Sequence, residues 1–239
     1  MRLAKYLAIA GLASRRGAEQ IVRQGRVKVN DVLTVQPQTD VSASDFITVD
    51  GVMLKKTEKK YYLLLNKPPG YISTVSDTHD RKTVMRLIYD IQARLYPVGR
   101  LDADTCGVML LTNDGALAHR LTHPRFCVKK VYRAWVRGVP ESASLKRMIV
   151  GLVVDGQKTL PAEVKLITVG PEKHSALLEI TISEGRKRQV KKMCAAIGHP
   201  VIGLCRSSFA GLKADDLSEG AYRHLTDAEV GHLYCLVKL

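Results

Sequence analysis

Two aspartates in residues 99–115 are the side chains most directly suited to chemistry in this sequence. The stretch reads Gly-Arg-Leu-Asp-Ala-Asp-Thr-Cys-Gly-Val-Met-Leu-Leu-Thr-Asn-Asp-Gly and contains Asp102 and Asp104. The apolar run 108–111 predicts a buried strand, and residues 113–115 predict a turn. A carboxylate fixed beside a buried strand can act as a nucleophile or an acid–base group, and two can share a metal ion. The alternative is that both aspartates only cap a turn.

A basic helix is predicted close to residue 190. Val190, Met193, Cys194 and Ile197 have the spacing of one apolar helical face, and a glycine follows. The opposite side carries basic residues: Arg188, Lys191 and Lys192. From spacing alone, this side is either a solvated surface or a site for an anion.

A tyrosine lies within the strand predicted at 131–136. Alternation along a strand places Tyr132 on the same face as Ala134 and Val136. Core packing, with the hydroxyl satisfied, is the usual role of such a tyrosine.

The composition indicates a globular protein with an anionic partner. The chain has 239 residues, is 46% hydrophobic and carries a formal net charge of +14. Such a charge attracts polyanions, so nucleic acid is the first candidate and an anionic membrane surface the second. No apolar run approaches the roughly 20 residues of a membrane span, and the N-terminus lacks the pattern of a signal peptide. Five scattered cysteines, with no Cys-x-x-Cys pair, favour neither disulfides nor zinc. We therefore expect a cytoplasmic protein with reduced thiols and no membrane contact.

The first 50 residues predict a small module that binds rather than reacts. Helices are expected at 2–10 and from Ser14 to Gly25, followed by strands at 27–29, 32–35 and 46–49. Within the first 28 residues, seven cations accompany a single acid, Glu19: Arg2, Lys5, Arg15, Arg16, Arg23, Arg26 and Lys28. A solvated surface is one interpretation, and contact with RNA phosphates is the other.

This arrangement of two helices followed by Gly-x-Val-x-Val-Asn resembles the S4 RNA-binding domain. The lysine-rich stretch 52–60 predicts a polar linker, with a domain boundary at about residue 58. We thus expect an S4-like domain and linker over 1–58 and a catalytic domain over 59–239.

The larger domain alternates strands and helices. Strands are predicted at 61–65, 108–111, 131–136, 162–169, 176–182 and 201–204, and helices at 83–91, 116–121 and 144–149. This mixture predicts an α+β fold built on a mostly antiparallel sheet.

Motifs near residues 15, 66, 102, 132 and 191 occur in the order found in pseudouridine synthases, and the chain resembles the RsuA family among them. The resemblance implies a mixed sheet with a central cleft and no metal or organic cofactor. It implies that Asp102 is the essential carboxylate, that Tyr132 lies against the target base and that Lys191 contacts Asp102. It also implies that Arg100 fills the gap left by the base or holds a phosphate. The basic residues Arg186, Arg188 and Lys192 are expected to bind RNA.

The resemblance further implies a substrate and leaves alternatives open. Details around residues 10–16 and 105–107 are closer to members acting on the large ribosomal subunit, so a uridine in 23S rRNA is favoured over one in 16S rRNA. The substrate is ribosomal RNA or an assembly intermediate, and we expect a monomer.

Two rival functions remain at this stage. One is a non-catalytic RNA-binding factor for ribosome assembly. The other is an RNA hydrolase with Mg²⁺ at Asp102 and Asp104, although no further oxygen ligands are evident nearby. His119 and His123 have zinc-like spacing but no companion ligand, which favours a plain helix surface.

Overall fold

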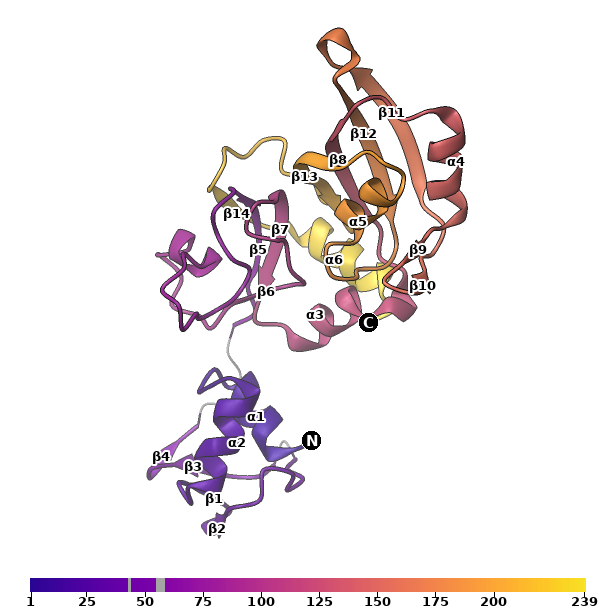
Figure 1. Ribbon diagram of the computed structural model, residues 1–239. Coiled ribbons are helices and arrows are strands. Elements are labelled where there is room, and N and C mark those ends of the chain that lie inside the picture. The colour runs from indigo at the N-terminus through magenta and orange to yellow at the C-terminus, as the bar shows by residue number, and fades with distance from the viewer. Residues whose placement is uncertain (43, 55–58) are drawn as a thin grey trace. The chain divides into compact units, whose positions relative to one another are not determined.

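The computed structural model describes residues 1–42, 44–54 and 59–239, which form two compact units. The first contains residues 1–61, 92–94 and 113–115, and the second contains 62–91, 95–112 and 116–239. Figure 1 shows each unit with its own sheet. The predicted boundary at residue 58 lies outside the described residues. No helix among those described is long and apolar enough to cross a membrane.

The N-terminal unit packs two helices on a four-stranded antiparallel sheet. Its elements are α1 (Leu3–Ile9), α2 (Arg15–Arg23), β1 (Val27–Val29), β2 (Val32–Thr34), β3 (Ile47–Val49) and β4 (Val52–Met53), with strand order β2-β1-β3-β4. The Ser14 hydroxyl caps α2 by accepting from the Gly17 amide, as predicted. Apolar side chains from both helices and the sheet form one core, among them Leu3, Leu7 and Val22. The predicted helices and first three strands are confirmed, whereas β4 replaces the start of the predicted linker.

The larger unit is built on one mixed sheet in the order β11-β12-β8-β13-β7-β5-β14, with β6 paired to β7. Its strands are β5 (Tyr62–Lys67), β6 (Tyr96–Pro97), β7 (Cys106–Thr112), β8 (Lys130–Arg137), β11 (Glu163–Val169), β12 (Ser175–Ile182), β13 (Val201–Phe209) and β14 (Tyr222–His224). A separate hairpin joins β9 (Val153–Val154) to β10 (Gln157–Lys158). Neighbouring strands are antiparallel except β7 and β13, which are parallel. The α+β fold with a mostly antiparallel sheet is confirmed.

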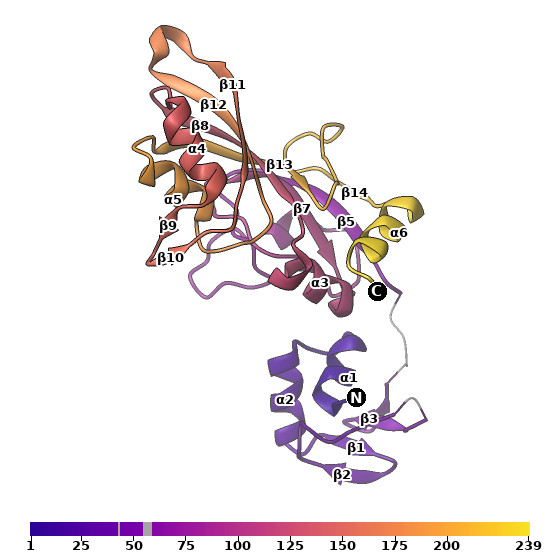
Figure 2. The same ribbon diagram turned by 90° about the vertical axis from the view of Figure 1, so that its right-hand side faces the viewer.

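Helices cover this sheet at two places. α3 (Gly115–Thr122) and α6 (Asp227–Leu236) contribute Leu117, Leu121 and Leu233 to a core shared with β5 and β7. α4 (Ser142–Val150) packs against β11, and α5 (Gln189–Ala196) packs against β13. Figure 2 shows α4 and α5 near the β8, β11 and β12 half of the sheet, and α3 and α6 toward β5 and β7. The central strand β7, which follows the two aspartates, thus contributes Val108 and Leu110 to this core.

One helix prediction is wrong. Residues 83–91 contain only a 3₁₀ turn, η1 (Val84–Leu87). The Val84 amide donates to the Ile72 carbonyl, and Thr83 forms a bridge with Ile72. Tertiary pairing thus takes the backbone groups that a helix would need. Short turns η2 (Pro124–Phe126) and η3 (Pro171–Lys173) complete the unit.

Helix α6 was not predicted, although its start carries a recognisable signal. Thr226 and Glu229 form a reciprocal capping box, in which each side chain accepts from the backbone amide of the other. Arg223 of β14 also pairs with Glu229 at 2.8 Å. The Thr-x-x-Glu spacing in the sequence is the pattern that identifies this helix start.

Candidate active site

The loop that carries the two aspartates is fixed from β5. Lys67 ends that strand with its side chain fully buried, and its Nζ donates to the carbonyls of Thr105 at 2.8 Å, Pro68 at 3.0 Å and Ala103 at 3.4 Å. Burial lowers the pKa of Lys67 to about 8. The Thr105 amide donates to the Asp102 carbonyl at 3.1 Å, which closes the turn. Lys67, in the sequence motif around residue 66, therefore fixes the backbone of the loop that carries Asp102.

Lys191 of α5 lies between the two carboxylates. Its Nζ is 2.5 Å from Asp104 Oδ1 and 3.7 Å from Asp102 Oδ2. The lysine side chain is 12% exposed, whereas those of Asp102 and Asp104 are 37% and 66% exposed. Hydrogen bonding from Lys191 lowers the pKa of Asp104. The predicted proximity of Lys191 to Asp102 is present, and Asp104 competes for the same ammonium group.

A cavity of about 890 Å³ opens beside this loop. Asp102 and Tyr132 both line it, and Tyr132 is buried on β8. This volume is within the usual range for small-molecule sites. The cavity therefore places a carboxylate and an aromatic ring around one bound group.

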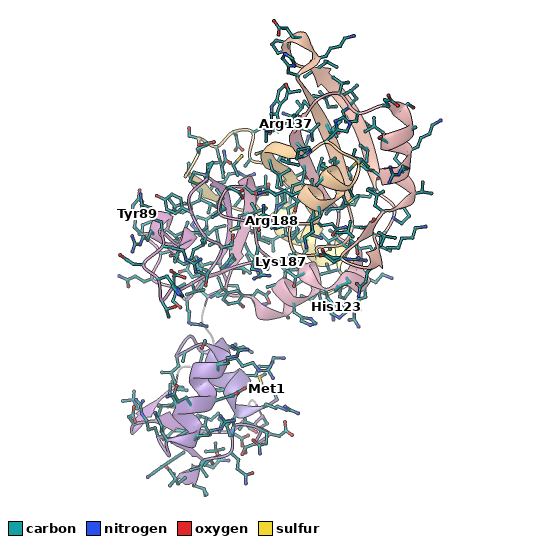
Figure 3. The ribbon with its side chains drawn as sticks, viewed as in Figure 1. Met1, Tyr89, His123, Arg137, Lys187 and Arg188 are labelled. Carbon is teal, nitrogen blue, oxygen red and sulfur yellow. The ribbon has the colours of Figure 1, made fainter. Side chains whose placement is uncertain are left out.

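Exposed cations line the same cavity. Arg100 precedes Asp102 on the loop, and Arg188 precedes α5 with a left-handed backbone (φ 54°). Lys187, which sequence reasoning did not select, also lines it, and Figure 3 shows Lys187 and Arg188 near the middle of the larger unit. A phosphodiester chain entering the cavity meets positive charge here.

Two other predicted RNA-binding residues have partners inside the protein. Arg186 pairs with Glu184 at 3.1 Å and donates to carbonyls of β10. Lys192 pairs with Asp155 in the β9–β10 turn. Both side chains thus fasten the β9–β10 hairpin to the α5 region, a role that the sequence did not indicate.

The predicted cations of the N-terminal unit are exposed. Arg26 makes a two-pronged pair with Asp50, with nitrogen–oxygen distances between 2.5 and 3.2 Å. Within the described part of the chain, the remaining six have no ion pair: Arg2, Lys5, Arg15, Arg16, Arg23 and Lys28. Arg15 and Arg16 begin α2, where a positive charge opposes the helix dipole.

The histidine pair has an ordinary structural role. The rings of His119 and His123 are 5.4 Å apart, and His123 Nδ1 accepts from the Arg125 amide at 3.2 Å to cap η2. Across residues 1–42, 44–54 and 59–239, no three His, Cys, Asp or Glu side chains are grouped to hold a metal ion.

Two cations of the cavity, Arg206 buried and Lys130 half-buried, were missed by sequence reasoning. Lys130 of β8 and Arg206 of β13 both line it. Lys130 lies two residues before Tyr132, in a motif from which a role was predicted for the tyrosine alone. Arg206 is an isolated basic residue in a strand, and no local pattern distinguishes it from a surface position.

Comparisons with known proteins match this geometry to one family. The family model described as RNA pseudouridylate synthase matches residues 61–196, and that of the S4 domain matches residues 1–47. The ribosomal large subunit pseudouridine synthase B of Bacillus subtilis is 43% identical, over 98% of this chain and 96% of its own length. An uncharacterized RNA pseudouridine synthase of Aquifex aeolicus is 40% identical, over 100% and 96% of the two chains.

A solved structure shows the same fold over nearly the full length. The crystal structure of a pseudouridylate synthase superposes with a TM-score of 0.68 at 33% identity, covering 98% of this chain and 99% of that one. The family model covers residues 61–196, a range that includes Asp102 and Lys191, and the relatives and the solved structure cover nearly the whole chain. The chain therefore belongs to the RNA pseudouridylate synthase family and is an RNA pseudouridine synthase with an S4 domain.

Proposed function

We propose that this enzyme converts one uridine of 23S ribosomal RNA to pseudouridine, with Asp102 as the essential carboxylate. The observation that carries the proposal is the cavity that Asp102 shares with Tyr132, with Lys191 3.7 Å from Asp102. The choice of RNA rests on the relative in Bacillus subtilis, whose name specifies the large ribosomal subunit. The enzyme acts as a cytoplasmic monomer on ribosomal RNA or an assembly intermediate, without metal or organic cofactor.

The reaction assigns a part to each of these residues. Isomerisation breaks the N1–C1′ bond, forms a C5–C1′ bond and exchanges the proton on C5 for one on N1. A stacked uridine is out of reach, so the base must leave the helix and enter the cavity. Asp102 then attacks the base or acts on the ribose, and the nearby Lys191 ammonium offsets its negative charge as water leaves. Tyr132 stacks on the uracil.

Mapping of pseudouridine in both ribosomal RNAs tests this function. Purified protein is incubated with unmodified 23S and 16S rRNA in EDTA, and the maps of a gene-deletion strain are compared with those of its parent. The expected result is one new site in 23S rRNA in vitro and loss of the same site in the deletion strain. A site in 16S rRNA would transfer the assignment to the small subunit. No product on any rRNA or assembly intermediate would favour the RNA-binding factor, and metal-dependent cleavage would favour the hydrolase.

The N-terminal cations are expected to supply affinity rather than chemistry. Replacing Arg15, Arg16 and Arg23 with glutamine should weaken binding to rRNA and lower its salt dependence. Each lost phosphate contact reduces the slope of log K against log salt by about 0.7–0.9, so loss of three contacts should reduce it by about 2–3. Binding titrations over several salt concentrations measure this slope.

The matched control removes the same charge from the larger unit. Lys146, Arg147 and Lys165 are exposed and lie outside the cavity. Their replacement with glutamine should leave the slope nearly unchanged. Equal slopes for wild type and the N-terminal variant would show that the Arg15 cluster is a solvated surface.

A further inference from the structure

Arg206 is a buried cation whose hydrogen-bonding capacity is only partly used. Its side chain is 2% exposed, and its Nε donates to the Val108 carbonyl at 2.8 Å. The guanidinium carbon lies 4.9 Å from the centre of the Phe209 ring. One terminal nitrogen, Nη2, is buried without a partner. Burying an unpaired charged donor is costly, which calls for a ligand that satisfies it.

Lys130 is a second, half-buried cation beside the same ring. Its Nζ donates to the Val128 carbonyl at 2.9 Å and lies 6.0 Å from the centre of the Phe209 ring. Burial, and then the charge of Arg206, lower the pKa of Lys130 to about 8, so it is mainly cationic at neutral pH. In the described parts of the chain, neither cation takes part in an ion pair.

Both cations line the cavity beside Tyr132 and are less exposed than Arg100 and Arg188, two other arginines of the cavity. Arg206 is paired in register with Tyr132 on the adjacent strand, and all three residues line the cavity. The exposed cations Arg100 and Arg188 line the cavity too and are available to the phosphates of the RNA strand. The group that enters deepest is the extruded uracil, whose two carbonyl oxygens are hydrogen-bond acceptors.

We propose that Arg206 and Lys130 bind the carbonyl oxygens of the extruded uracil, with Arg206 donating through its guanidinium group. This inference rests on the proposed function. It assigns the pair two tasks: holding the base beside Tyr132, and stabilising negative charge on the base. When the N1–C1′ bond breaks, its electron pair stays with the uracil and spreads to the carbonyl oxygens. A fixed cation binds that state more strongly than the neutral base and so accelerates the step.

A double-mutant cycle tests the contact by combining a substitution in the protein with a substitution in the RNA. Once the target site is mapped, short RNAs carry uridine, 2-thiouridine or 4-thiouridine at that position, because sulfur accepts hydrogen bonds poorly. Single-turnover rates are measured for wild type and Arg206→Met. Loss of a hydrogen bond to a charged group corresponds to about ten- to hundredfold in rate. We expect such a loss for Arg206→Met on uridine and for wild type on one thio substrate, but a much smaller second loss when both changes are combined.

The contrary outcome is equally distinct. If both thio substitutions slow Arg206→Met by the same factors as they slow wild type, Arg206 does not contact the base, and the proposal fails while the proposed function stands. Wild type that forms no pseudouridine would instead overturn both. Arg133→Met is the matched control, because Arg133 is exposed and lies outside the cavity. Its rates should follow those of wild type on all three RNAs.

A second variant keeps the test decisive if Arg206→Met does not fold. The Lys130 side chain gives up a single hydrogen bond, to the Val128 carbonyl, when it is replaced by methionine. Lys130→Met should show the same non-additive pattern with one of the thio substrates. If the effect of Lys130→Met on the rate is simply additive, in free energy, with the effect of each thio substitution, Lys130 does not contact the base. That result would contradict the proposal.

Discussion

Asp102→Asn is expected to lower the rate of pseudouridine formation by about four orders of magnitude or more while the protein stays folded. Removal of a covalent or charge-stabilising group typically has an effect of this size. The amide is nearly isosteric with the carboxylate, and the loop is held by backbone contacts of Lys67 and Thr105 that the substitution does not touch. Single-turnover assays on mapped rRNA fragments measure the rate, and circular dichroism and RNA binding check the fold.

Asp104→Asn is the matched control, two residues away on the same loop. Asp104 makes the shorter contact with Lys191, so distance alone does not choose between the two aspartates. Asp102 lines the cavity and Asp104 is the more exposed of the two, which favours Asp102 as the reacting group. We expect Asp104→Asn to retain activity within about tenfold of wild type. Equal loss in both variants, or appreciable turnover by Asp102→Asn, would contradict the assignment.

The parts of the site that follow a local pattern could be predicted from the sequence. The apolar run after Asp102 is a buried strand, and the apolar spacing around Met193 places that residue in the core. These periodicities fix which side of α5 carries Lys191. The meeting of Asp102 with Lys191 was inferred from family resemblance, because nothing local relates two residues 89 positions apart.

The parts that depend on tertiary pairing could not be predicted in this way. Arg186 and Lys192 belong to a basic run, yet each is held by a partner on or beside the β9–β10 hairpin, which has no strong sequence signal. Conversely, Arg206 lies within an ordinary strand and becomes a cavity residue only because β13 pairs with both β7 and β8. Charge alone therefore does not separate binding residues from structural ones.

The parallel contact between β7 and β13 joins the two halves of the site. Its register pairs Cys106 with Cys205 and Gly107 with Arg206. Tyr132 and Arg206 lie on the β8–β13 side of this junction, and the Asp102 loop precedes β7 on the other. Gly107 has a φ of +105°, and a Cβ built on it would lie 2.2 Å from the Arg206 carbonyl oxygen. Contacts this close to backbone cannot be relieved by a side-chain rotation.

Gly107→Ala is accordingly expected to destabilise the protein by about 3–5 kcal/mol, because backbone strain and overpacking each cost about 1–3 kcal/mol. The two strands must move apart, so the surviving folded protein should also lose activity as Asp102 and Tyr132 separate. Chemical denaturation measures the first effect, and single-turnover rates measure the second.

Gly198→Ala is the control: its φ is +86°, but no atom lies within 4 Å of the added Cβ. It isolates the cost of the backbone conformation, about 1 kcal/mol. Equal destabilisation of the two variants would show that the close approach of β7 to β13 does not restrict the size of the side chain at position 107.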